Sequence, residues 1–266
     1  MSAHRPTHGG KNISVVLVGG LDPGAGAGVL RDLLVATTLG AQAVVVGTAW
    51  TVQGSPAAQG SFFDVDPRDP ERVRHALRAA LAEAGTESTS VKIGMIATAA
   101  IAQAVLATLA PFAGPVVYDP VLRASSGGSL YDGGRESVLA LARRATLLTP
   151  NLDEAAWLLD RPVRTQSDAR NAARDLRDLG ISAVLVKGGH LEGDATDVLR
   201  TPAGESLLSC PRIAGPSPRG TGCALATAIA TLLAGGQPLE LAVATAKTWL
   251  TRRIANACAA GDERHL

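Results

Sequence analysis

Short runs of β-branched and aliphatic residues alternate along the chain with longer amphipathic stretches that are rich in Ala and Leu. The short runs are Val15 to Val18, Ala43 to Gly47, Val91 to Ile93, Val116 to Tyr118, Thr146 to Leu148 and Ala183 to Val186. The longer stretches have helical spacing and lie near residues 28–39, 68–84, 98–109, 134–143, 167–179, 221–234 and 238–259. Such alternation is typical of a mainly parallel sheet with right-handed crossovers. The pattern therefore predicts an α/β fold with helices on both faces of the sheet.

The remaining segments predict how this fold is bounded. No linker rich in Pro, Gly and Ser separates two halves, so we expect one domain over residues 13–266. Residues 1–12 are polar and Gly-rich, which indicates a disordered lead-in. Residues 54–65 are irregular and predict an edge strand or a flap. Residues 196–200 and 205–209 flank Pro202-Ala203-Gly204 and predict a late hairpin.

Composition and charge exclude several classes of protein. Aromatic residues make up 3% of the chain and hydrophobic residues 46%, so the core must consist mainly of Ala, Val, Leu and Ile, which suits a buried parallel sheet. The net charge of +1 gives no electrostatic footprint for nucleic acid or an anionic membrane. No apolar run reaches the roughly 20 residues that span a bilayer. The basic start and the apolar run from Ile13 to Leu21 resemble a signal peptide, but Asp22-Pro23 closes the run, which reads equally well as a first buried strand.

Cysteine usage indicates the compartment. The chain has three widely spaced cysteines and no C-x-x-C pair, so neither a zinc site nor a disulfide framework is expected. A reduced, cytoplasmic protein fits this pattern best.

A first glycine-rich loop, Gly20 to Gly28, follows the first predicted strand and precedes a helix. Glycines let the backbone approach a ligand, and a helix start offers unpaired N–H groups. A dinucleotide fold would need an acidic residue at the end of the second strand, and Gly47-Thr48-Ala49 contains none. Asp22 in the loop is a candidate to hold a ligand hydroxyl or amine. Asp32, on the following helix, could equally be an ordinary exposed acid.

A second glycine-rich loop opens the helix near residue 221. Its residues Gly220, Thr221 and Gly222 precede a helix of small and apolar residues, whose positive N-terminal end predicts an anion hole for phosphate. Arg219 would add positive charge. Cys223 lies in the first turn, where the helix is expected to lower the thiol pKa. The alternative is that Cys223 is a small residue packing the start of the helix.

Polar residues follow three of the middle strands. Asp119 and Glu154 are candidates to bind Mg²⁺, directly or through water, and Lys187 could neutralise a phosphate. Glu154 could instead be a helix-start acid and Lys187 a surface residue at a strand end. The chain has no G-x-x-x-x-G-K-[ST] motif, so a classical P-loop is excluded as the phosphate-binding device.

Taken together and in order, these residues resemble the hydroxymethylpyrimidine/phosphomethylpyrimidine kinases of thiamin biosynthesis, in the ribokinase-like superfamily. The resemblance extends from about Val15 to the last helix. Its pieces are Gly20-x-Asp22-Pro23, Gly26-Ala27-Gly28 with Asp32, Thr48-Ala49 with Gln53, Lys92 to Met95, Asp119-Pro120-Val121, Thr149-Pro150-Asn151 with Glu154, Lys187 to His190 with Asp197, and Gly220 to Cys223.

The resemblance implies a three-layer α/β/α sandwich, ATP and Mg²⁺ as cofactors, and a homodimer whose pyrimidine site is partly covered by a flap. Cys223 takes the place of the catalytic base, Lys187 contacts ATP phosphates, and Gly220 to Gly222 form the anion hole. Asp119 and Glu154 manage Mg²⁺. The positions that hold the pyrimidine are those of Gly20, Asp22, Asp32 and Gln53.

The chain departs from the family pattern at several positions, and two alternatives remain open. Leu21 stands where the family has Ser or Thr, and Arg219 where it has His. A pyridoxal kinase would use the same scaffold for a similar heteroaromatic hydroxymethyl group. A non-catalytic pyrimidine-binding regulator is the alternative from another class.

Overall fold

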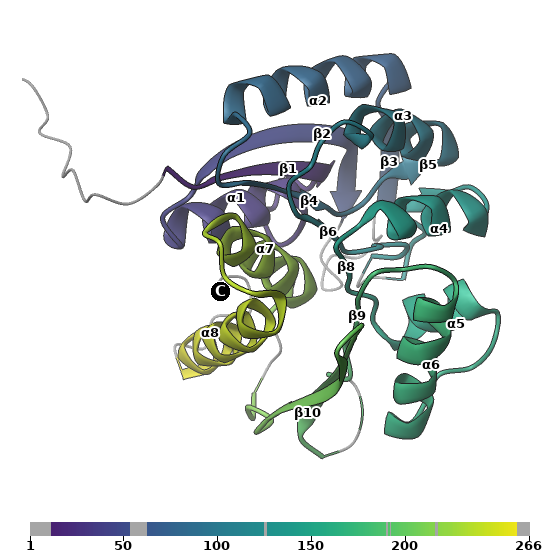
Figure 1. Cartoon of the computed structure of the whole chain (residues 1–266), viewed down its shortest axis with the longest axis vertical. Helices are drawn as coiled ribbons and strands as arrows, with labels where there is room; N and C mark the ends of the chain where they lie inside the picture. The colour runs from purple at the N-terminus through teal and green to yellow at the C-terminus, as the bar shows by residue number, and fades with distance from the viewer. Residues whose placement is uncertain are drawn as a thin grey trace, which may run out of the picture.

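The computed structural model describes residues 12–53, 63–124, 127–189, 191, 193–215 and 218–259. Its centre is a nine-stranded sheet with the strand order β11-β10-β9-β8-β6-β4-β1-β2-β3 (Figure 1). The strands are β1 (Ser14–Leu21), β2 (Gln42–Gln53), β3 (Phe63–Pro67), β4 (Thr89–Ile93), β6 (Val116–Tyr118), β8 (Leu147–Leu148), β9 (Val184–Val186), β10 (Ala195–Thr201) and β11 (Gly204–Cys210). The strands from β9 to β2 are parallel, and β3, β10 and β11 add antiparallel edges.

Helices cover both faces of the sheet, which confirms the predicted α/β/α sandwich (Figure 1). One face carries α1 (Gly28–Thr38), α7 (Thr221–Ala234) and α8 (Leu239–Ala259). The other carries α2 (Pro70–Ala84), α3 (Ala99–Leu109), α4 (Arg135–Arg144), α5 (Leu152–Leu159) and α6 (Gln166–Asp178).

The alternation of side chains along β1 builds these two cores. Val16 and Val18 point into the core under α2 to α6, whereas Val15 and Leu17 point into the core under α1, α7 and α8. All four side chains are fully buried. Burial on both faces favours apolar residues at successive positions, and Val15 to Val18 of β1 form such a run.

The structure adds elements that the hydrophobic pattern did not predict. Helix α5 has only eight residues, and its signal is a capping box in which Asn151 and Glu154 bond each other's backbone N–H groups. Two-residue strands β5 (Ala97–Thr98) and β7 (Tyr131–Asp132) form a small second sheet. Such short elements depend on tertiary contacts rather than on periodicity.

The predicted edge features have mixed outcomes. The late hairpin is confirmed as the antiparallel pair β10 and β11, with Thr201 opposite Gly204. Strand β3 is an edge strand at the end of the segment expected to form an edge strand or flap; residues 54–62 lie outside the described residues. The predicted lead-in lies almost entirely outside them as well. In the described part of the chain, no helix has the length and apolarity that a membrane crossing requires.

Candidate active site

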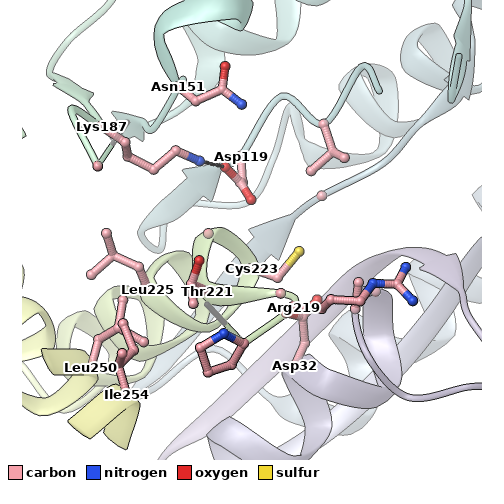
Figure 2. Close-up of a pocket in the computed structure, with 18 of the residues that line it drawn as sticks. Asp32, Asp119, Asn151, Lys187, Arg219, Thr221, Cys223, Leu225, Leu250 and Ile254 are labelled. Carbon is pink, nitrogen blue, oxygen red and sulfur yellow. Dashed lines mark hydrogen bonds and ion pairs between the residues drawn. The ribbon is translucent and has the colours of Figure 1, made fainter. Parts of the chain in front are cut away.

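A cavity of about 610 Å³ opens at the carboxyl ends of the parallel strands. Residues of β1, β4, α1, α5, α7 and α8 line it, together with residues that directly follow β6 and β9 (Figure 2). This edge is where open α/β sheets bind ligands, because the loops that leave parallel strands converge there. The cavity brings together ten of the predicted site residues: Gly20, Asp22, Asp32, Asp119, Glu154, Lys187, Gly220, Thr221, Gly222 and Cys223. The side chain of Gln53 lies outside what the structure describes.

The two glycine-rich loops pack directly on each other. Gly220 has a φ of 76°, and a Cβ there would lie 2.4 Å from the carbonyl oxygen of Gly26. Gly28 has a φ of 66°, and its Cβ would lie 2.3 Å from the carbonyl oxygen of Gly20. Only glycine accommodates both the left-handed backbone and these approaches. The glycines therefore bring the starts of α1 and α7 to one side of the cavity.

Asp22 is buried at the edge of the first loop. Its Oδ1 accepts a hydrogen bond from the Gly24 backbone N–H at 3.1 Å. Its Oδ2 is also buried and has no hydrogen-bond partner among the described residues. Because a buried carboxylate oxygen without a partner is destabilising, this atom is suited to a donor that a ligand supplies.

Asp32 is fully buried, so the interpretation of it as an exposed helix acid is wrong. Its Oδ2 accepts a hydrogen bond from Lys92 Nζ at 2.6 Å, and its Oδ1 accepts one from the Thr227 hydroxyl at 2.7 Å. Burial alone would lower the pKa of Lys92, but the Asp32 carboxylate holds that pKa above its usual range. Both Asp32 oxygens thus have hydrogen-bond partners within the protein, at the floor of the cavity.

The start of α7 presents backbone N–H groups without a side-chain cap, since Gly220 is the N-cap residue. The positive end of the helix therefore faces the loops that line the cavity. A Cβ at Gly222 would lie 3.1 Å from Lys187 Nζ, which places the ammonium group beside the first turn. Helix start and ammonium together form a site suited to an anion.

Cys223 lies in this turn (Figure 2), where the charges of Lys92 and Asp32 act on its thiol. The thiol is buried, and burial raises its pKa to about 11, although Lys92 opposes the shift. The expectation that the helix start lowers this pKa is therefore wrong. Removing the thiol from water disfavours the thiolate more than the helix dipole and Lys92 favour it. At neutral pH Cys223 is a protonated thiol.

Lys187 lies between the two predicted metal-binding acids. Its Nζ donates to Asp119 Oδ1 at 2.6 Å and lies 3.9 Å from Glu154 Oε2 (Figure 2 shows the Asp119 contact). The Thr149 hydroxyl also donates to Asp119. The Lys187 side chain is only 14% exposed, so it is not a surface residue at a strand end.

Glu154 has two roles in this cluster. Its Oε2 accepts a hydrogen bond from the Asn151 backbone N–H at 2.7 Å, so it does act as a helix-start acid. Burial raises the pKa of Glu154 to about 7, while Lys187 opposes and Asp119 adds to the shift. Its charge is therefore sensitive to pH near neutrality, unlike that of an exposed glutamate.

The acids fit a magnesium ion that arrives with phosphate ligands. Among the described residues no group of three or more His, Cys, Asp or Glu side chains could hold a metal ion unaided. Mg²⁺ in phosphate-transferring sites is commonly held by one or two carboxylates together with water and phosphate oxygens. Asp119 and Glu154 supply two carboxylates on either side of a cation already present, the Lys187 ammonium.

Two further contacts hold the loop that follows Lys187. Asp197 Oδ1 accepts a hydrogen bond from the Gly188 N–H at 2.9 Å, and its Oδ2 accepts one from Lys247 Nζ on α8 at 2.6 Å. The Arg212 side chain donates to the carbonyl oxygens of Gly189, Leu191 and Gly193. Sequence reasoning missed Lys247 and Arg212. The available signal was a lysine among the apolar residues of α8.

Comparison with known proteins identifies the family of the chain. A family model described as phosphomethylpyrimidine kinase matches residues 22–265. The chain belongs to the phosphomethylpyrimidine kinase family. A hydroxymethylpyrimidine/phosphomethylpyrimidine kinase from Streptomyces coelicolor is 38% identical over 242 residues, covering 90% of this chain and 88% of the relative.

Solved structures of two kinds of kinase share the fold. A phosphomethylpyrimidine kinase from Clostridium difficile superposes with a TM-score of 0.76 at 27% identity, covering 91% of this chain and 99% of that one. A pyridoxal kinase from Staphylococcus aureus, in complex with AMP-PCP and pyridoxal, gives 0.82 at 26% identity, covering 93% and 89%. The ribokinase-like fold is therefore confirmed, and the family is decided by sequence rather than by the superposition.

Proposed function

We propose that this protein uses ATP to phosphorylate 4-amino-5-hydroxymethyl-2-methylpyrimidine and then its monophosphate, giving the diphosphate needed for thiamin biosynthesis. The observation that carries the proposal is the start of α7, where uncapped amides, Lys187 and Cys223 meet at one cavity in a chain of this family. Phosphoryl transfer depends mainly on positioning and on stabilising charge, and this arrangement supplies both.

In this proposal, different groups around the cavity bind the transferred phosphoryl group, the nucleotide phosphates and the adenine ring. The amides of Thr221 to Cys223 receive its oxygens, and Lys187 offsets the charge of the nucleotide phosphates. Apolar side chains of Leu225, Leu250 and Ile254 line the nucleotide side of the cavity and suit an adenine ring. A magnesium ion held by Asp119 and Glu154 would supply further charge neutralisation when the nucleotide is bound.

Gly20, Asp22 and Gln53 form the acceptor side in this proposal. The unpartnered Oδ2 of Asp22 supports a hydrogen bond from the substrate, whose amino group is a donor. Asp32 contributes differently from the expected direct contact. Because Lys92 and Thr227 occupy its oxygens, Asp32 positions the floor of the site beneath Cys223.

Cys223 is proposed to act as the base of the first transfer through its minor thiolate form, which has released its own proton to solvent and takes the hydroxyl proton late in the step. With a pKa of about 11, the thiolate is only about one part in ten thousand at pH 7, so the resting thiol orients the hydroxyl group rather than ionising it. A loose transition state needs little proton removal before bond breaking. In the second transfer the nucleophile is already a phosphate oxygen, and no base is required.

Cys223→Ala therefore should slow the first phosphorylation about 100-fold and the second less than about fivefold, as expected when one proton-transfer group is lost. The measurement is separate kcat/KM values for the alcohol and the monophosphate at saturating MgATP. Cys210→Ala is the matched control, because Cys210 also lines the cavity but lies at the end of β11. Equal losses in both steps would show that Cys223 supports the anion hole instead.

The decisive test of the whole proposal is an acceptor screen with ATP that reports mono- and diphosphorylated products separately. We expect the pyrimidine alcohol and its monophosphate to be preferred over pyridoxal and pyridoxine. Pyridoxal kinases share the fold at 26–27% identity. If the protein phosphorylated pyridoxal in preference to the pyrimidines, it would be assigned as a pyridoxal kinase instead. Ligand binding without ATP consumption would instead identify a non-catalytic regulator.

A homodimer in the cytoplasm completes the proposal. Trp50 and Val52 on β2 and Leu34 on α1 are half exposed, which supports an apolar contact surface for a second copy. Cys210 and Cys223 are both free thiols, as in a reducing compartment. Light scattering of the purified protein tests the dimer directly, and a monomer at all concentrations would refute it.

A further inference from the structure

We infer that Arg219 is the specificity residue for the phosphorylated acceptor, holding the phosphate of the monophosphate during the second transfer. This inference rests on the proposed function and extends it to a position where the chain has arginine instead of the histidine expected from the family pattern. Arg219 comes directly before Gly220, the N-cap residue of α7.

The position of Arg219 is the first support. A Cβ at Gly26 would lie 3.6 Å from Arg219 Nη1 and 3.7 Å from Asp22 Oδ2. The guanidinium group is therefore directed to the first glycine loop, on the acceptor side of the cavity that both side chains line.

The arrangement of cations around α7 is the second support. Lys187 lies against Gly222 on one side of the first turn, and Arg219 lies against Gly26 on the other. Figure 2 shows Lys187 and Arg219 on opposite sides of Cys223. A line of phosphate groups that crosses the helix start would thus meet a cation at each end, with the transferred group over the amides between them.

The charge of the second reaction explains why a second cation is needed. The acceptor monophosphate brings a charge of about −1.5 to −2 against a nucleotide that is already anionic. Like charges at close range in a partly buried site repel strongly. The first reaction has a neutral alcohol and lacks this repulsion, so only the second depends on a cation on the acceptor side.

The chemistry of the two side chains also matches this acceptor. Its amino group and its phosphorylated hydroxymethyl group lie on adjacent ring carbons, so it presents a hydrogen-bond donor beside an anion. Asp22 offers an unpartnered acceptor oxygen and Arg219 a planar fork of donors suited to phosphate, within one small region of the loop.

The experiment measures both phosphorylations for Arg219→Gln and Arg219→Lys. We expect kcat/KM for the monophosphate to fall about 10- to 100-fold in Arg219→Gln, as for loss of a hydrogen bond to a charged group, and that for the alcohol to change less than about twofold. Arg219→Lys should lie between because it keeps the charge without the fork. Arg72→Gln, an exposed position on α2 with the same change in net charge, should leave both steps unaltered.

Each other outcome is informative. Equal losses for both acceptors, or no loss, overturn the inference. If the wild-type protein makes the monophosphate but no diphosphate, the inference about Arg219 is overturned, although the proposed first phosphorylation still holds. If the wild type phosphorylates neither pyrimidine, the proposed function fails, and calorimetry with the monophosphate still decides whether Arg219 binds the phosphate. If Arg219→Gln does not fold, the Arg219→Lys comparison carries the test.

Discussion

Two lysine–carboxylate pairs of the same length lie on either side of Cys223, and they do different work. Lys92 Nζ and Asp32 Oδ2 are 2.6 Å apart at the cavity floor, and Lys187 Nζ and Asp119 Oδ1 are also 2.6 Å apart at its wall. The first pair is sealed, with side chains at most 1% exposed. The Lys187 side chain is 14% exposed and has a second acid, Glu154, at 3.9 Å.

The two pairs have the same N–O distance, so we infer that the solvent exposure and neighbours of each pair, rather than its geometry, decide what it can do. In the sealed pair, the Thr227 hydroxyl donates to the remaining Asp32 oxygen, so both oxygens already have partners within the protein. In the open cluster one ammonium group lies near two carboxylates, and the magnesium and nucleotide phosphates of the proposed function would be able to redistribute those contacts. The buried pair of Lys92 and Asp32 is suited to stabilising the fold. The more exposed Lys187 is suited to exchanging its carboxylate partners for ligand groups during a reaction.

The largest expected effect comes from removing the open lysine. Lys187→Met should reduce kcat by about 100- to 1,000-fold, the range seen when one preorganised charge-stabilising donor is lost. The melting temperature should change little, because the freed acids can be protonated or hydrated at the cavity wall. Kinetics and thermal melts on the same preparation check both parts. If Lys187→Met lost stability in proportion to its loss of activity, the cluster of Lys187 with Asp119 and Glu154 would have a structural role like that of Lys92 and Asp32.

Removing the sealed lysine should produce the opposite pattern. Lys92→Met leaves a buried carboxylate uncompensated, and we expect the free energy of unfolding to fall by about 3–5 kcal/mol. The double variant Asp32→Leu with Lys92→Met should recover most of that loss, since it removes both charges together. Chemical denaturation of the three proteins tests this. Unchanged stability in Lys92→Met would mean that the pair is not closed in solution.

The smallest effect is a pH dependence specific to the open cluster. The folded pKa of Glu154 is about 7, above its ordinary 4.5, so folding favours the protonated form. This contribution to stability is fully present below pH 4.5 and is lost as the pH rises through 7. In Glu154→Gln, the free energy of unfolding should no longer show this decrease between pH 5 and about 8. The measurement is made with a chelator present and without nucleotide. A profile identical to that of the wild type would contradict the raised pKa.

Much of the fold followed from periodicity, and the exceptions have one cause. Six strand runs and seven helical stretches correspond to structural elements because buried apolar surface repeats with a regular spacing. The short helix α5 and the small sheet of β5 and β7 are too brief to show a period. Their positions depend on local capping and on neighbouring elements.

The site followed from sequence less completely, because charge environments are three-dimensional. The glycine loops and the polar residues after the strands identified the cavity wall, since the carboxyl ends of parallel strands must meet at one edge. The pairing of Asp32 with Lys92 joins residues 60 positions apart, and that of Asp197 with Lys247 joins residues 50 apart. No local pattern contains such contacts.

By itself the sequence determined the layered α/β architecture, the family and the two glycine loops that meet at one cavity, because these depend on spacing along the chain. Only the tertiary structure decided which charges are free to act. Burial reversed the expected acidity of Cys223, sealed Asp32 within the floor and placed Lys187 between two acids. The physical reason is that the free energy of a charge depends on the water it loses and the partners it gains, and both are set when distant segments pack together.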